Sequence, residues 1–277
     1  MLRFLFGMVV AASATFSYAG LLTFSATGAN VAAIQPAVDS FRSALGTLNP
    51  NSAGSFGTGR REINWDGVPD NFSAPNLLPA NFFNVNSPRG VVFSTPGTGF
   101  QVSASASSGT PVEFGNINPG YSNIFAAFSP QRLFTALGSN VVDVNFFVPG
   151  SSTPAFTTGF GAVFTDVDFA NTTSIQFFNL ANALIGTVFA PNTAGSETFS
   201  FAGGLFDAGE QIGRVRIFSG NAALGPNESA NIDLAVMDDF IYAEPRTIAA
   251  AVSEPATLGL LLLSLAFGTW LVRRAQR

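Results

Sequence analysis

The sequence of 277 residues contains no cysteine, no histidine and no lysine. All 12 residues counted as lysine or arginine are arginine. These absences exclude Ser-His-Asp and Cys-His nucleophiles, Schiff-base and P-loop lysines, and zinc sites built from histidine or cysteine. Disulfide bonds are excluded as well, so the fold depends on packing alone. Enzymatic chemistry is left with pairs of carboxylates and with metal ions bound by oxygen atoms.

Positive charge is scarce in the central part of the chain. Residues 20–251 hold 16 acidic residues and 8 arginines, a net charge of −8. This balance disfavours nucleic acid as a partner, because the phosphate backbone is bound by clustered positive charge. Hydrophobic residues are abundant, at 47% of the chain, and include 30 phenylalanines. The chain can therefore form a large core.

Residues 1–19 have the three parts of a secretory signal peptide. Arg3 supplies the positive n-region, and residues 4–12 form an apolar h-region that is too short to span a bilayer. The tripeptide Ser-Tyr-Ala that ends at Ala19 has the small side chains that signal peptidase accepts. We therefore expect export of the protein, with cleavage between Ala19 and Gly20.

A second apolar segment lies near the end of the chain. Residues 256–272 carry no charge, and as a helix they reach roughly 25 Å. This length is at the short end of what crosses a hydrocarbon core of about 30 Å. Arg273, Arg274 and Arg277 follow the segment, and positive charge is retained on the cytoplasmic side. We expect a transmembrane helix over 256–272, with the body of the protein outside.

The residues around this segment follow a characteristic order. A Glu-Pro pair, then alanine and threonine, precede the apolar span, and an arginine cluster follows it. This order resembles the PEP-CTERM sorting signal of exported proteins from exopolysaccharide-producing bacteria. The residues that carry the resemblance are Glu254, Pro255, Ala256, Thr257, Arg273, Arg274 and Arg277. Ser253 stands where the family has its first proline.

The resemblance implies a processing partner and a route. In that family the signal is processed by exosortase, a membrane transpeptidase with a cysteine nucleophile. The protein would stay transiently in the inner membrane as a single-pass intermediate and would then reach the cell surface or the extracellular space. Residues 246–277 would thus be a linker and a temporary sorting tail.

The middle of the chain is typical of an all-β protein. Residues 20–60 are rich in Ala, Ser, Asn and Gly, with one short helix expected within 35–49. From about residue 89 on, short segments with a period of two alternate with Gly, Pro or Asn turns. We expect strands at 89–94, 100–105, 141–148, 160–168, 174–180, 184–189, 197–203, 213–218 and 236–242.

Repeated short strands without a long helical period indicate an antiparallel β-sandwich, which we expect over residues 61–245. A jelly roll is the expected topology, and the pattern is similar to the jelly-roll bodies that are commonly joined to PEP-CTERM tails. The whole chain is then a sandwich between an N-terminal signal helix and a C-terminal transmembrane helix.

Two acidic pairs are candidate metal ligands. Asp166 and Asp168 are two residues apart, so that in a strand they share one face, whereas Asp238 and Asp239 point to opposite faces of a regular strand. If both pairs met at one rim, they would offer Ca²⁺ several hard oxygen ligands. This resembles carbohydrate-binding jelly rolls that hold a structural Ca²⁺ at an acidic final strand. No other cofactor is expected.

Each of these candidates has a simpler interpretation. The acidic residues would then lie at solvated strand ends, where they cap turns or pair with Arg214 and Arg216. Similarly, the aromatic residues Trp65, Tyr121 and Tyr242 could stack on sugar rings, but a position in the core is the better prediction.

Two functions remain open from the sequence. The first, which we favour, is a non-enzymatic protein of the cell surface or extracellular matrix that binds polysaccharide. The second is a secreted glycoside hydrolase that uses Asp166 as acid and Asp239 as base. A hydrolase requires its two carboxyl groups to be about 5 Å apart (retaining) or roughly 6.5–9.5 Å apart (inverting), and both must line a cleft.

Overall fold

The computed structural model describes residues 20–248. The expected signal peptide, the transmembrane helix over 256–272 and the sorting motif lie outside these residues. Within 20–248, no helix has the length and apolar character needed to cross a membrane.

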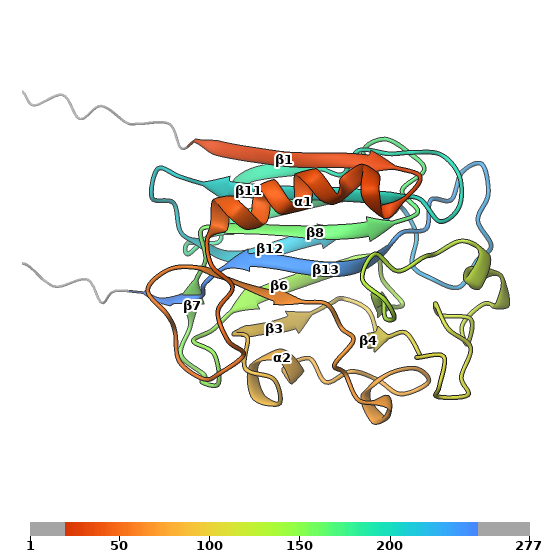
Figure 1. Cartoon of the computed structure of the whole chain (residues 1–277), viewed down its shortest axis with the longest axis horizontal. Coiled ribbons are helices and arrows are strands. Elements are labelled where there is room, and N and C mark those ends of the chain that lie inside the picture. Colours follow the sequence, from red (N-terminus) through yellow and green to blue (C-terminus); the bar gives the residue numbers. More distant parts are fainter. Residues whose placement is uncertain (1–19, 249–277) are drawn as a thin grey trace, which may run out of the picture. The chain divides into compact units, whose positions relative to one another are not determined.

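Two antiparallel β-sheets form the framework of the described chain (Figure 1). The strands of the seven-stranded sheet are β1 (Leu21–Gly28), β2 (Arg60–Ile63), β4 (Gly99–Val102), β5 (Phe134–Leu137), β8 (Gly159–Thr165), β11 (Phe199–Phe206) and β13 (Val236–Ala243). Their order is β1–β11–β8–β13–β5–β4, and β2 pairs with the second half of β13. The protein is thus mostly β, as the sequence predicts.

The five-stranded sheet contains β3 (Val91–Ser94), β6 (Val141–Phe146), β9 (Ser174–Asn179), β10 (Leu184–Phe189) and β12 (Ile212–Phe218). Its order is β10–β9–β12–β6–β3. A small ladder joins β7 (Ala155–Phe156) to β14 (Arg246–Thr247). The described helices are α1 (Val31–Leu45), α2 (Phe82–Val85), and the 3-10 turns η1 (Asp70–Phe72) and η2 (Pro119–Asn123).

The period of two places alternate side chains in the core between the sheets. In β6, Val142, Val144 and Phe146 are buried in the main core. In β12, Val215 and Ile217 are buried there as well, while the arginines between them point the other way. Because successive side chains of a strand leave opposite faces of the sheet, Arg214 and Arg216 lie on the second face of this sheet.

Aromatic side chains fill much of the core. Trp65 stacks on Phe134 with 4.1 Å between the ring centroids, and its indole N–H donates to the carbonyl oxygen of Asp238 at 2.7 Å. Tyr121 and Tyr242 are fully buried too. The prediction of a core position for these three aromatic residues is confirmed, and none of them is available to stack on a sugar.

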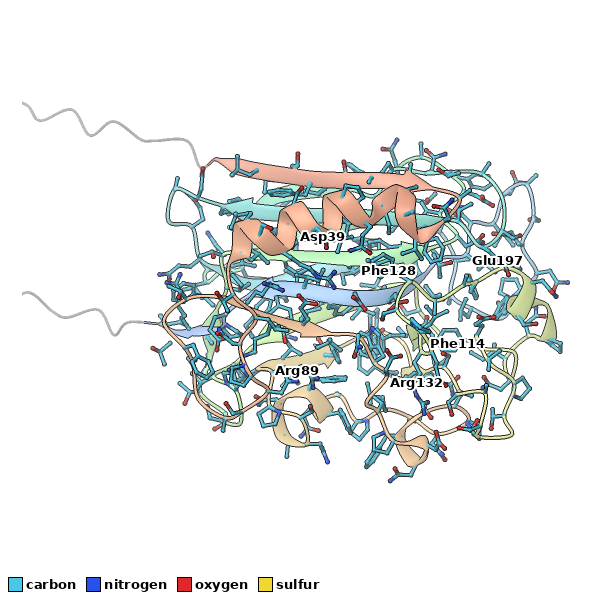
Figure 2. The ribbon with its side chains drawn as sticks, viewed as in Figure 1. Asp39, Arg89, Phe114, Phe128, Arg132 and Glu197 are labelled. Atoms are coloured by element: carbon cyan, nitrogen blue, oxygen red, sulfur yellow. The ribbon has the colours of Figure 1, made fainter. Side chains whose placement is uncertain are left out.

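Helix α1 covers the outer face of the seven-stranded sheet. The side-chain oxygen of Asn30 accepts a hydrogen bond from the Ala33 N–H and caps the helix. Ile34, Val38, Phe41 and Leu45 are buried, and their spacing of three and four residues places them on one side of the helix. Phe128 packs into the same cluster beside α1 (Figure 2). The expected helix exists, but it begins and ends four residues before the predicted range of 35–49.

The sheet begins earlier in the chain than predicted. The sequence pattern predicts a sandwich from residue 61, with a low-complexity segment over 20–60. Instead, β1 pairs with β11 along its full length, from Leu21 opposite Phe206 to Gly28 opposite Phe199. Residues 21–45 therefore belong to the same folded body as the later strands.

Candidate functional site

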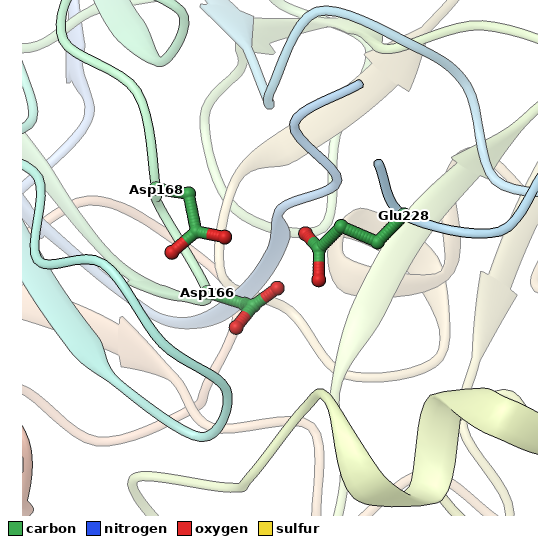
Figure 3. Close-up of side chains that lie close together, drawn as sticks. All are labelled: Asp166, Asp168 and Glu228. Atoms are coloured by element: carbon green, nitrogen blue, oxygen red, sulfur yellow. The ribbon is translucent and has the colours of Figure 1, made fainter. Parts of the chain in front are cut away.

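An acidic cluster lies where β8 ends and the chain approaches β13. Strands β8 and β13 are antiparallel neighbours, with Thr165 opposite Val236. The residues just after β8 and those before β13 therefore come together at one end of the sheet. Asp166 and Asp168 follow β8, and Glu228 lies in the segment between β12 and β13. Figure 3 shows the three side chains grouped together.

The three carboxylates are close enough to share one ligand. One oxygen from each of Asp166, Asp168 and Glu228 lies within 4.8 Å of the others. The Asp166 side chain is fully buried, and its backbone has a left-handed φ of 66°. Among the described residues, nothing donates a hydrogen bond to either Asp166 carboxylate oxygen or to Oε1 of Glu228. Such unpartnered buried oxygens are rare in folded proteins.

The electrostatics of the cluster follow from this geometry. Burial, followed by the charge of nearby Glu228, raises the pKa of Asp166 to about 9. Burial and the charge of Asp168 raise the pKa of Glu228 as well. Within residues 20–248, no arginine forms a salt bridge with any of the three. The cluster thus lacks a counter-charge from the described protein.

A fourth acid holds the loop after β8 in place. Asp233 accepts hydrogen bonds from the backbone N–H of Asp168 at 3.0 Å and of Phe169 at 3.3 Å, and from the hydroxyl of Thr172. Asp168 Oδ1 accepts in turn from the Gly195 N–H at 2.8 Å. Asp233 therefore positions the loop, whereas the free oxygens of the cluster belong to Asp166, Asp168 and Glu228.

The prediction that Asp238 and Asp239 belong to this group differs from the structure. Strand β13 has an irregularity between Met237 and Phe240, so the two aspartates are not on opposite faces of a regular strand. Both accept a hydrogen bond from the Ser129 hydroxyl, at 3.2 Å for Asp238 and 2.7 Å for Asp239. They form a separate buried pair, outside the three-carboxylate cluster.

Each member of this second pair has its own partners. Asp238 Oδ2 accepts from the backbone N–H of Phe128 at 2.6 Å and of Ser129 at 3.2 Å. Asp239 Oδ2 accepts from Arg42 at 3.1 Å. Burial, followed by the charge of Asp239, raises the pKa of Asp238. The interpretation that these acids lie at a solvated strand end and pair with Arg214 or Arg216 is wrong, because both are buried and Asp239 pairs with Arg42.

The reasoning from the sequence missed Glu228. Nothing in the local pattern NESANID at 227–233 marks this glutamate as a partner of Asp166. Glu228 could be found only from the strand topology. Strand β13 must first be placed beside β8, and only then can the segment before β13 be assigned to this end of the sheet.

The outer face of the five-stranded sheet is the second candidate site. Cross-strand pairing places two mixed rows of outward side chains across it, beside a third row that is mostly apolar and contains Val141, Phe218, Ser174 and Phe189. One row contains Thr187, Gln176, Arg216, Asp143 and Ser94, and the other contains Leu184, Phe178, Arg214, Asn145 and Val92. All of these residues except Asp143 and Ser174 are exposed or half-buried. The opposite sheet has its outer face under α1, whereas this one is open.

Hydrogen bonds fix the polar groups of this face. Arg214 Nη1 donates to Asp143 Oδ1 at 2.6 Å, and Arg216 donates to both Asp143 oxygens at 2.8 Å. The Arg214 guanidinium also lies 3.8 Å from the ring centroid of Phe178. The hydrogen bonds from Arg216 and Arg214 outweigh the effect of burial and lower the pKa of Asp143. The face therefore combines prearranged polar side chains with apolar ones such as Phe178 and Leu184.

A cavity of about 180 Å³ lies elsewhere, between the end of α1 and the end of β13. Its lining includes Leu45, Thr158, Glu244 and Arg246 but none of the four predicted aspartates. It is therefore not the carboxylate-lined cleft that a glycoside hydrolase requires.

The function of these sites has to be inferred from their own chemistry. Comparisons with known protein families, curated proteins and solved structures find no match to this chain.

Proposed function

We propose that this protein is an exported, non-enzymatic component of the cell surface or extracellular matrix, with a jelly-roll body that binds polysaccharide. Its C-terminal PEP-CTERM-like signal is processed by exosortase after a transient stay in the inner membrane. The observation that carries the binding proposal is the open polar face of the five-stranded sheet.

The strand order supports the jelly roll. Eight strands alternate between the sheets along the chain: β5, β8, β11 and β13 lie in one, and β6, β9, β10 and β12 in the other, with β9 and β10 consecutive. Their spatial orders are β11–β8–β13–β5 and β10–β9–β12–β6. Two interleaved Greek keys give this arrangement in an eight-stranded jelly roll.

The placement of the aspartates favours binding over hydrolysis. Asp166 is fully buried, and Asp239 is 2% exposed and accepts from Ser129 and Arg42. A glycosidase needs both carboxyl groups on a cleft, where one reaches the leaving oxygen and the other the sugar or a water molecule. The proposed acid and base have neither this exposure nor a common set of contacts.

The chemistry of the open face suits a sugar polymer. Sugar hydroxyls both donate and accept hydrogen bonds, and the face offers guanidinium donors together with the amide groups of Gln176 and Asn145, which do both. Phe178 and Leu184 add apolar surface for the C–H faces of sugar rings. Because hydrogen bonds already hold Arg214 and Arg216, little side-chain entropy is lost on binding.

A glycan array tests this proposal directly. The protein should bind one or more bacterial polysaccharides, and the substitutions Gln176→Ala and Arg216→Ala should weaken binding by about tenfold, the effect of losing one hydrogen bond. Asp39→Ala, on the exposed side of α1, is the matched control and should bind as the wild type does. If wild type binds no glycan, or if both face variants bind normally, polysaccharide binding at this face is wrong.

A further inference from the structure

We propose that Asp166, Asp168 and Glu228 form a Ca²⁺ site that joins the loop after β8 to the segment before β13. The expectation of a calcium site from the sequence is kept, but its ligands change: Glu228 enters, and Asp238 and Asp239 leave. The proposal does not depend on polysaccharide binding or on sorting by the tail.

The first argument is the buried, unpartnered carboxylate. Asp166 is fully buried, and among the described residues neither of its side-chain oxygens receives a hydrogen bond. Its carboxylate faces Glu228, whose Oε1 also has no donor within residues 20–248 (Figure 3). Burying polar oxygens without partners is costly, and a cation between them would remove that cost.

The second argument is the charge balance of the folded body. Every arginine that forms a salt bridge within the described chain does so with acids other than these three. Arg246 lies over the Phe156 ring, and Arg89 donates to Ser87 and to the carbonyl oxygen of Glu62. Among the described residues no arginine neutralises these carboxylates, so their charge has to be balanced by a bound proton or by a cation from solution, and a cation would satisfy all three carboxylates at once.

The donor set selects the kind of cation. Three carboxylates, in a chain without cysteine or histidine, favour a hard ion over zinc or copper. Ca²⁺ accepts six to eight oxygen ligands in irregular geometry, whereas Mg²⁺ demands a near-ideal octahedron. The three ligands come from two loops rather than from one compact motif, which favours the more tolerant ion. Extracellular calcium modules of this kind bind with Kd of about 10⁻⁴–10⁻³ M.

The site would act as a cross-link between distant parts of the chain. Asp168 is already tied to Gly195 in the β10–β11 loop and to Asp233 before β13. A cation held by Asp166, Asp168 and Glu228 would add a bond between the β8–β9 loop and the β12–β13 segment. All three loops lie at the same end of the sheet, so Ca²⁺ would stiffen this end as a unit.

Thermal unfolding of the full chain with and without calcium tests the proposal. In 10 mM CaCl₂ the Tm should rise by about 5 °C relative to EDTA, because a ligand of millimolar or submillimolar affinity that binds only the folded state stabilises it. Asp166→Asn and Glu228→Gln should each abolish the rise. Both substitutions keep the size of the side chain and remove a buried charge, so the variants should fold. Asp207→Asn, an exposed carboxylate outside the cluster, is the matched control and should keep the full rise.

Four outcomes decide the matter. A rise in wild type and Asp207→Asn, but not in the two cluster variants, supports the site. No rise in wild type overturns it, and an equal rise in wild type and Asp166→Asn places the bound calcium elsewhere and overturns it too. A rise of the same size with 10 mM MgCl₂ overturns the choice of calcium. Because the readout is Tm, a failed glycan array leaves this result unaffected, and a failed calcium test leaves the glycan result unaffected.

Discussion

Arg61 and Glu244 form a buried ion pair in which two nitrogens of the guanidinium face two oxygens of the carboxylate. Nε donates to Oε2 at 2.8 Å, and Nη2 donates to Oε1 at 2.9 Å. The side chain of Arg61 is fully buried, and Glu244 is 2% exposed. The remaining N–H groups of Arg61 donate to the backbone carbonyls of Pro50, Ser52, Gly54 and Pro88. One guanidinium thus fastens the loop before β2 to the end of β13.

Replacing Arg61 with methionine should therefore destabilise the protein strongly. The Arg61→Met variant leaves the Glu244 carboxylate buried without its counter-ion, and the carbonyl groups of Ser52, Gly54 and Pro88 lose the donor that Arg61 supplies. Removing one partner of a buried ion pair costs about 3–5 kcal/mol. Urea unfolding should show this loss as a lower midpoint with an unchanged slope.

An exposed ion pair on α1 provides the contrast. Arg42 lies 3.5 Å from Asp39, whose side chain is 60% exposed. Asp39→Asn should change the free energy of unfolding by less than about 1 kcal/mol, because solvent screens such pairs. If Arg61→Met cost no more than Asp39→Asn, the loop would be held by other contacts and this account of the pair would be wrong.

Close packing between α1 and the sheet depends on Gly161 in β8. A Cβ atom at this position would lie 2.9 Å from Cε1 of Phe41 and 3.0 Å from Cζ of Phe201. Gly161→Ala should therefore cost about 1–3 kcal/mol through overpacking. Gly57→Ala, where no atom lies within 4 Å of the added Cβ, is the control and should be neutral or slightly stabilising. Equal Tm values for the two variants would contradict the close approach.

The pH dependence of stability should reveal the buried pair Asp238 and Asp239. Burial and then the charge of Asp239 raise the pKa of Asp238, so the folded state holds a proton that the unfolded state releases above about pH 4. The free energy of unfolding therefore falls as the pH rises. The stability that protonated Asp238 contributes is lost as the pH rises through its raised pKa. Asp238→Asn cannot ionise and should lose less stability than wild type between pH 5 and pH 9.

The same proton linkage sets the size of the pH dependence and identifies a control variant. The slope of the free energy of unfolding can differ by up to about 1.4 kcal/mol per pH unit for one proton. Urea unfolding in EDTA at pH 5, 7 and 9 measures it without divalent cations. Asp143→Asn is the control, because the pKa of Asp143 is lowered and its contribution disappears only in acid. Parallel curves for wild type and Asp238→Asn would show that Asp238 keeps one protonation state over this range.

The parts of the fold that the sequence predicts are those set by local alternation. Val142 and Val144 point inward and Asp143 outward because they are neighbours in one strand. Strand β1 escaped prediction for the opposite reason. Its segment LLTFSATG has no clear alternation, and its position is fixed by pairing with β11 and by the cover of α1, both of which are tertiary effects.

Only part of the candidate metal site could be predicted from the sequence. Asp166 and Asp168 could be predicted as a pair, but not as neighbours on one strand face, because β8 ends at Thr165 and Asp166 has a left-handed φ of 66°. Glu228 could not, because its approach to Asp166 depends on the register of Thr165 against Val236. The interpretation of Asp238 and Asp239 assumed a regular strand, and a single irregularity after Met237 is enough to turn both toward Ser129.

Export should produce a mature protein that begins at Gly20. The h-region over 4–12 is short and is followed by small residues at the expected cleavage site. In the structure, β1 begins at Leu21, directly after this site. N-terminal sequencing of secreted protein should therefore start with Gly-Leu-Leu. An intact Met1 on the exported, folded protein would contradict the signal peptide.

The sorting tail gives the prediction with the most consequences. We expect Glu254 and Pro255 at the outer boundary of the inner membrane, where a membrane transpeptidase could reach them, with the apolar segment 256–272 holding the chain there. The arginines after the segment would then prevent it from sliding out, because moving their charges through hydrocarbon costs several kcal/mol. Deleting residues 256–277 should release a folded body, since no helix within residues 20–248 could replace the anchor.

Replacing Glu254 and Pro255 should have the opposite effect. The anchor would remain while the processing motif is lost, so the full-length protein should accumulate in the inner membrane. Fractionation of both variants and wild type, in a host that has exosortase, distinguishes the two outcomes. Ser253→Ala is the control, since it alters the neighbouring position but leaves Glu254-Pro255 intact, and it should be processed like wild type. If the Glu254/Pro255 variant leaves the membrane as wild type does, the tail is an ordinary anchor and the resemblance to PEP-CTERM signals has no functional meaning in this chain.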